Sequence, residues 1–225
     1  MGHQGDRNER DAMQTETHNL TFRASKFKEL MLYVAEKSVE DATFDAIKLN
    51  KILFFSDFLH FGLAHSSITG ATYRREADGP TATQLPAMAK ELEQSHCGHF
   101  VVELTQRRLV ADRPSNSSIF SDEERDLIDD VIKNLEDSDA PDASYLGYIS
   151  SRAWQISEEG GIIPYTAVFL ANHKVTNSGL QSGRVFGFLW KSLLSRRIRS
   201  LSSTGAENIT ALDNPGLQVL ARSAE

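Results

Sequence analysis

An aspartate lies in the middle of the most apolar stretch of this sequence. Within residues 44–63 the apolar side chains are too dense for a one-sided helix, and at 100° per residue they surround most of the circumference. The pattern therefore predicts a central, buried helix. Asn50 and Asp57 share one of its faces, with His60 about 60° away. An ionised Asp57 in such surroundings requires a hydrogen-bond or cationic partner, because an unpaired buried carboxylate is unfavourable.

Two roles stay open for Asp57 at this point. It is either a structural carboxylate that pairs with a neighbouring segment, or a polar group that faces a ligand or partner. Arg75 is one internal partner that the sequence offers. At the ends of the helix, Thr43 or Asp45 can act as the N-cap, and Gly62 is expected to loosen the last turn.

Three possible metal ligands are crowded into His96-Cys97-Gly98-His99. Zinc takes about four nitrogen or sulfur ligands, usually from separated pairs, and no second pair lies nearby. The tetrapeptide is better interpreted as a helix end, with Gly98 stopping the helix and His96 facing its carbonyl end. We expect no metal and no cofactor.

The motifs of common enzymes are absent from the sequence. Gly160-Gly161 does not lead into a phosphate-binding loop, and no Gly-x-Ser-x-Gly elbow is present. We therefore expect a protein that is not an enzyme. The polar start lacks the apolar centre of a secretory signal, and the single Cys97 excludes an internal disulfide framework. Both features favour the cytoplasm.

Charge is distributed unevenly along the chain. The net charge of −7 argues against nucleic acid as a partner, because phosphate binding requires a basic surface. Residues 122–142 are rich in carboxylates, and the cluster at 122–130 is interpreted as a solvated helix face. Residues 184–201 combine apolar groups with arginines and a lysine, which predicts a basic amphipathic helix. Packing on the protein itself, on an acidic partner or on a membrane stays open, and the first is favoured.

Apolar periodicity predicts further helices around the central one. They span residues 24–38 with Ser25 as N-cap, residues 81–94 with Pro86 in the first turn, and residues 121–135 with Ser121 at the start. Two more short helices are expected, at residues 142–150 and after Pro164.

Strand-like residues are few. Residues 71–75 predict an extended segment that ends at a break, Asp78-Gly79-Pro80, before the next helix. Residues 100–104 and 108–110 predict an antiparallel hairpin. The predicted fold is mainly α (α+β), a compact helical domain around a buried central helix with a small antiparallel β-element.

This predicted domain occupies only part of the chain. Flanking it, the sequence predicts four further segments: a disordered N-terminal segment at 1–20, a linker at 172–183, the basic helix at 184–201 and a flexible tail at 202–225. The domain itself is placed at residues 21–171.

Three motifs in this order resemble a known family. They are KLNKILFFSDFLHFG at residues 48–62, TGATYRREADGP at 69–80 and AWQISEEGGIIPY at 153–165. Together they resemble the Panacea domain family, which includes SocA-type antitoxins and phage-associated GepA-like proteins, over about residues 22–171. One departure is visible. Ser150-Ser151 stands where members have a Ser/Thr-His pair, so no role is transferred for that imidazole.

The resemblance implies a mostly helical antitoxin that neutralises a cognate toxin by direct binding. Some members resemble adaptors that hand a toxin to a protease, which is the alternative function. A protease is then a further partner, no nucleic acid is expected, and membrane contact through residues 184–201 stays open.

Arginine and aromatic side chains next to a rigid break are the best candidates for contacting a partner, because Tyr, Trp and Arg most often anchor interfaces. Trp154 and Tyr73 are equally well interpreted as core residues. The predicted partner-binding residues are Asp57, Tyr73, Arg74, Arg75, Gly79, Pro80, Trp154, Pro164 and Tyr165.

Overall fold

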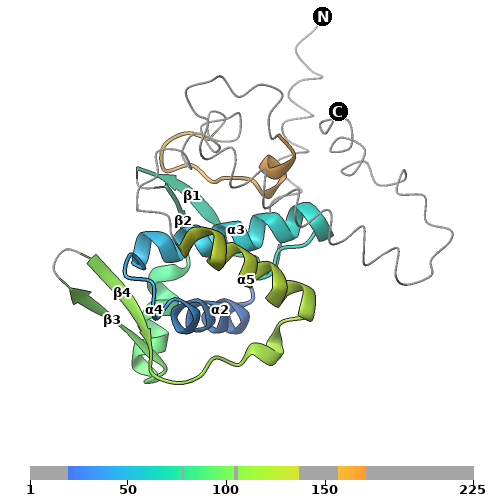
Figure 1. Ribbon diagram of the computed structural model, residues 1–225. Coiled ribbons are helices and arrows are strands. Elements are labelled where there is room, and N and C mark those ends of the chain that lie inside the picture. Colours follow the sequence, from blue (N-terminus) through green and yellow to red (C-terminus); the bar gives the residue numbers. More distant parts are fainter. Residues whose placement is uncertain (1–19, 78, 104–105, 137–156, 171–225) are drawn as a thin grey trace, which may run out of the picture.

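The structure, a computed structural model, describes residues 20–77, 79–103, 106–136 and 157–170 (Figure 1). Several sequence predictions lie outside these residues: Trp154, the helix at 142–150 and the segments before residue 20 and after residue 170. Within the described residues the architecture is four α-helices and two small antiparallel sheets. The predicted mainly helical α+β class is therefore confirmed.

Helix α3, Ala46–Ala64, is the predicted central helix. Figure 1 shows it running across the middle of the molecule, with the first sheet on one side and the other helices around it. Nearly every side chain from Lys48 to Leu59 is buried, so neighbours cover all faces of the helix. Elements that pack on it include α2 (Ala24–Lys37), α5 (Asp122–Glu136), β2 (Gly79–Ala82) and the 3₁₀ helix η2 (Tyr165–Leu170).

The ends of α3 are capped differently from one another. At the start, the Asp45 carboxylate accepts the Lys48 backbone N–H at 2.8 Å, which confirms one of the two predicted caps. The predicted loosening at Gly62 is wrong. The helix continues to Ala64, and His65 ends it in the left-handed conformation, donating its N–H to the Phe61 carbonyl.

Hydrogen bonds to residues 67–69 hold the start of helix α2. The prediction of Ser25 as its N-cap is wrong, because the cap residue is Arg23 and Ser25 lies in the first turn. The backbone N–H of Arg23 donates to the Thr69 carbonyl at 2.8 Å. The Arg23 guanidinium donates to the carbonyls of Ser67 and Ile68, both at 2.9 Å. The segment that follows α3 therefore fixes where α2 begins.

The first sheet differs from the sequence prediction. β1 (Tyr73–Glu76) pairs with β2 (Gly79–Ala82), so Gly79 and Pro80 lie inside a strand and the predicted break before a helix is wrong. Residues 160–163 pair with the other edge of β1. The N–H of Arg75 donates to Gly161, and the N–H of Ile163 donates to Tyr73. β1 is therefore the middle of three extended segments.

Helix α4, Leu85–Gln94, follows β2 and has Pro86 in its first turn, as predicted. The predicted hairpin is also confirmed, as β3 (Gly98–Glu103) and β4 (Gln106–Ala111). The interpretation of Gly98 as a helix stop is wrong. The helix ends at Gln94 and Gly98 opens β3, where a Cβ would lie 3.0 Å from Leu32 Cδ2.

Helix α5, Asp122–Glu136, has the predicted start. The Glu124 N–H donates to Ser121 Oγ at 3.2 Å, and the Ser121 N–H donates to the Glu124 carboxylate at 2.9 Å. This is a reciprocal capping box. The same carboxylate accepts the Lys26 ammonium at 2.7 Å, so the cap also joins α5 to α2. A 3₁₀ turn, η1 (Ser117–Ile119), precedes it, and η2 is the predicted short helix after Pro164.

Candidate functional site

Asp57 is fully buried, and its carboxylate joins three parts of the chain. Oδ1 accepts the backbone N–H of Thr69 at 2.7 Å, and Oδ2 accepts the hydroxyl of Thr69. The hydroxyl of Tyr73 donates to Oδ2 at 2.9 Å. The carboxylate therefore ties α3 to the 67–69 segment and to β1. Because hydrogen bonds from within the domain satisfy it, Asp57 is a structural carboxylate, one of the two roles left open by the sequence.

The 3₁₀ helix η2 also lies against Asp57, through Tyr165. Tyr165 is buried beside Asp57, stacks on Phe58 with ring centroids 4.4 Å apart and donates its hydroxyl to the Ala71 carbonyl at 2.7 Å. Burial raises the pKa of Asp57, although the hydrogen bonds from Thr69 and Tyr73 oppose that shift. Burial and the nearby Asp57 carboxylate both raise the pKa of Tyr165. The phenol therefore stays protonated and keeps its role as a donor.

The outward face of the first sheet carries an exposed arginine. Arg74 pairs across the ladder with Thr81 on β2 and bridges to Ile162 on its other side. Ile162 is 50 % exposed, although it is a large apolar side chain. The Arg74 side chain makes no hydrogen bond or ion pair with the residues that the structure describes. We define the β1 face as Thr81, Arg74 and Ile162, a row across three extended segments.

Apart from Trp154, the other predicted partner-binding residues are either buried or partly buried. Asp57, Tyr73 and Tyr165 meet in the core, and Gly79 and Pro80 are buried in β2. Arg75 and Pro164 are partly buried next to them, and Arg75 donates to the Ser157 carbonyl at 2.7 Å. The suggested Arg75–Asp57 pair is not formed among these bonds, since Asp57 is held by the threonine and tyrosines. Trp154 lies outside the described residues.

Two residues of this region escaped sequence reasoning. Thr69 supplies two of the hydrogen bonds to Asp57, and a threonine directly before glycine in the motif TGATYRREADGP was the signal that could have indicated it. Ile162 is exposed beside Arg74, yet its apolar type predicted burial. Such a residue can be assigned to a surface only once the strand alternation of residues 160–163 is known.

A second buried polar cluster holds the start of α3. Lys48 is almost fully buried and donates to the Asp41 carboxylate at 2.7 Å, to Thr43 Oγ1 and to the Glu136 carbonyl at 3.2 Å. Burial works against ionisation of Asp41, but the hydrogen bonds from Lys48 and Thr43 outweigh it and lower the pKa of Asp41. This cluster links the loop before α3 to the end of α5.

The histidine and cysteine side chains near residue 97 are held by other partners. Cys97 Sγ accepts the Arg113 Nε–H at 3.2 Å, and His99 Nδ1 lies 2.8 Å from Asp112 Oδ2. Across residues 20–77, 79–103, 106–136 and 157–170, no group of three or more His, Cys, Asp or Glu side chains is arranged to hold a metal ion. In the same ranges no helix combines the length and apolarity needed to cross a membrane.

The comparisons with known proteins agree with the motif order. Residues 49–155 match the family model of SocA-like antitoxins, the Panacea domain. The match covers just under half of the chain, includes α3, both sheets, α4 and α5, and confirms the resemblance deduced from the sequence. The match supports a general antitoxin role, with a toxin as partner. No curated protein and no solved structure was found to match.

Proposed function

We propose that this Panacea-domain protein neutralises a toxin by direct binding through the β1 face, without catalysis of its own. The observation that carries the proposal is the position of Arg74. A cation without an ionic partner among the described residues lies beside a half-exposed isoleucine, on a sheet whose other side is fixed to the core. Arginine is among the side chains that most often anchor interfaces.

The rigidity of the face supports the same proposal. Tyr73, the neighbour of Arg74 in β1, is 1 % exposed and hydrogen-bonded to Asp57. Ile163, the neighbour of Ile162, is buried and donates its N–H to Tyr73. Both exposed side chains are thus held by buried neighbours, so a partner meets a preformed surface and little ordering entropy opposes binding.

The test is co-expression with the product of the neighbouring small open reading frame, followed by co-purification. Direct binding predicts that the neighbour arrests growth alone and that this chain restores growth in a stable complex. Arg74→Ala and Ile162→Ala should each weaken the complex by roughly tenfold or more. Lys133→Ala removes an exposed cation on α5 and is the matched control, expected to leave affinity unchanged.

Each other outcome has a distinct meaning. Rescue with disappearance of the neighbour, reversed by deleting proteases, would point to an adaptor that promotes degradation. Equal affinity of the Arg74→Ala variant and the Lys133→Ala control would move the toxin to another surface. A harmless neighbour that does not co-purify would overturn the antitoxin assignment for this pair.

A further inference from the structure

In the part of the chain that the structure describes, the outer edge of β3 is open for hydrogen bonding. Cys97 accepts the N–H of Asp112, so in this antiparallel register the pairs His99–Val110 and Val101–Arg108 exchange hydrogen bonds. Phe100 and Val102 alternate with them, and their N–H and C=O groups point away from β4. Within the described residues, no backbone or side-chain group pairs with these four polar groups.

Edge strands usually carry devices that prevent pairing with other chains, such as lysine, proline or a bulge. β3 has the sequence Gly98-His-Phe-Val-Val-Glu103 and contains neither lysine nor proline, and its ladder with β4 is regular. Val102 is 72 % exposed, which is the largest exposure among the big apolar side chains of the described residues. The edge thus combines free backbone groups with an exposed β-branched residue.

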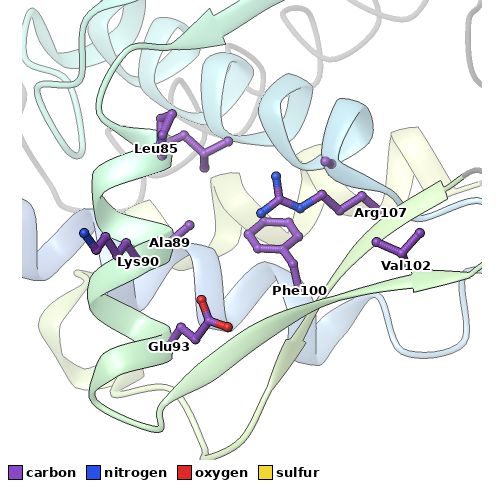
Figure 2. A pocket seen from close by; sticks show the side chains of 9 residues that line it. Leu85, Ala89, Lys90, Glu93, Phe100, Val102 and Arg107 are labelled. Carbon is purple, nitrogen blue, oxygen red and sulfur yellow. The ribbon is translucent and has the colours of Figure 1, made fainter.

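A pocket of about 390 Å³ lies between this hairpin and α4. Figure 2 shows Phe100 and Val102 rising from β3 on one side and Leu85, Ala89, Lys90 and Glu93 lying along α4 on the other. Ala46, at the start of α3, and Pro86 complete the lining. Much of the lining is therefore apolar, and the space is large enough for a side chain of a partner.

Cations predominate at the edge of this pocket. Arg107 extends from β4 over the Phe100 ring, with its guanidinium carbon 4.3 Å from the ring centroid (Figure 2). Lys90 lines the pocket from α4, and its ammonium points away from Arg107 in this view. Glu93 is the single lining carboxylate. None of these three charged side chains forms an ion pair within the described residues.

We propose that the β3 edge and this pocket bind an extended segment of a partner protein by strand addition, with an apolar side chain in the pocket and a nearby carboxylate on Arg107. Free N–H and C=O groups at strand spacing are matched by another extended backbone, which supplies affinity without sequence preference. The pocket and Arg107 supply the preference for an apolar residue with an acidic residue two positions away, because side chains two apart in a strand lie on the same face. This surface is separate from the β1 face, and the inference does not depend on the toxin-binding proposal.

Two variants of one residue test the edge directly. Val102→Pro removes an N–H that points outward, so it leaves the ladder to β4 intact and blocks the added strand. Val102→Thr keeps the N–H and the β-branched shape and is the matched control. A displayed library of random nonapeptides is selected on the full-length protein, and the enriched peptides are then synthesised and their affinities measured for both variants.

The expected result has three parts. Enriched peptides carry an apolar residue with an acidic residue two positions away, Val102→Pro weakens their binding at least tenfold, and Val102→Thr leaves it unchanged. Arg107→Glu should shift the selection from acidic towards basic peptides. In the free protein, amide hydrogen exchange should be fast at Phe100 and Val102 and slow at His99 and Val101, because only the latter pair donates to β4.

Four results would overturn the proposal. They are the absence of enriched peptides, equal binding to the Val102→Pro and Val102→Thr proteins, slow exchange at Phe100 and Val102 in the monomer, and a dimer that Val102→Pro dissociates. The third would show that another part of this chain covers the edge. The last would show that a second copy occupies it.

Discussion

Asp57 shows what a charged residue does inside an apolar helix. Its two oxygens accept hydrogen bonds from Thr69 and Tyr73, and Tyr165 lies beside them. The residues around this carboxylate come from the two motifs that follow the central helix. Thr69 and Tyr73 belong to residues 69–80, and Tyr165 belongs to residues 153–165. Its contribution to a binding surface is therefore indirect, because it positions the strand that carries Arg74.

We expect Asp57→Ala to lower the free energy of unfolding by about 3–5 kcal/mol, because it leaves the Thr69 N–H, the Thr69 hydroxyl and the Tyr73 hydroxyl buried without an acceptor. Tyr73→Phe, which removes one donor and keeps the carboxylate, should cost only about 1 kcal/mol. Urea denaturation of both variants measures these values. A stable Asp57→Ala protein that fails to bind its partner would instead place the carboxylate in the interface.

The lowered pKa of Asp41 predicts that the stability of the fold depends on pH. Its pKa in the folded protein lies below the ordinary 3.8, so the unfolded chain takes up this proton first as pH falls. The Asp41–Lys48 pair therefore stabilises the fold fully above pH 3.8, and this contribution is lost as pH falls through the lowered pKa. Asp41→Asn should destabilise the protein by about 3–5 kcal/mol at pH 7 and by progressively less as pH falls below 3.8.

Denaturation at pH 7, 5 and 3 checks this expectation, with Asp126→Asn as the control. Asp126 is an exposed carboxylate on α5, and its replacement should change stability little at any of the three values. A cost of Asp41→Asn that is equal at all three values would show that the packing of Asp41, and not its charge, stabilises the loop.

Residue types predicted the need for a partner at Asp57 but not the identity of that partner. Burial of the residue followed from the apolar side chains around it, which periodicity reveals. The Thr69 and Tyr73 contacts depend on how the chain turns after α3, and no local pattern encodes that turn. For the same reason Arg75 remained a plausible partner until the backbone of β1 was in place.

At the scale of elements, Gly70 allows the segment after α3 to lie directly against the chain that leads into α2. Gly70 has φ +73°, and a Cβ there would lie 2.4 Å from the Thr21 carbonyl oxygen. The close approach allows Thr69 to accept the Arg23 N–H and to donate to Asp57. Thus the end of α3, the start of α2 and the buried carboxylate share one short segment.

Gly70→Ala should therefore be strongly destabilising, and Gly160→Ala provides the matched control. Gly160 also has φ +73°, but a Cβ there meets nothing within 4 Å. Gly160→Ala should cost about 1–2 kcal/mol from the left-handed backbone alone. Gly70→Ala should cost at least about 2 kcal/mol more, because two backbone segments must separate. Equal melting temperatures for the two variants would contradict this account of the contact.

Elements with strong periodicity were predicted well, and short polar strands were not. The central helix, α5 with its Ser121 cap and the β3–β4 hairpin all follow from local sequence. β2 was missed because Gly79 and Pro80 signal a turn, whereas pairing with β1 and packing on α3 make the segment extended. Tertiary contacts also decided the cap of α2, which Arg23 takes in place of Ser25.

At the scale of the whole molecule, the two proposed surfaces belong to different sheets. The first sheet lies against α3 and η2, and the second lies against α2 and α4, on the other side of the central helix in Figure 1. No residue belongs to both surfaces. A partner on one surface therefore does not compete directly with a partner on the other.

The pairing of β1 with residues 160–163 also has a consequence for synthesis on the ribosome. Arg75 and Ser157 are separated by 82 residues and Ala71 and Tyr165 by 94, so the first sheet closes only after a long stretch of further chain has been made. At typical rates of elongation this delay is roughly 4 to 19 s. During that interval β1 has one unpaired edge and Asp57 lacks Tyr165. A chain terminated before residue 160 would therefore lack Ile162 beside Arg74, and with it the β1 face.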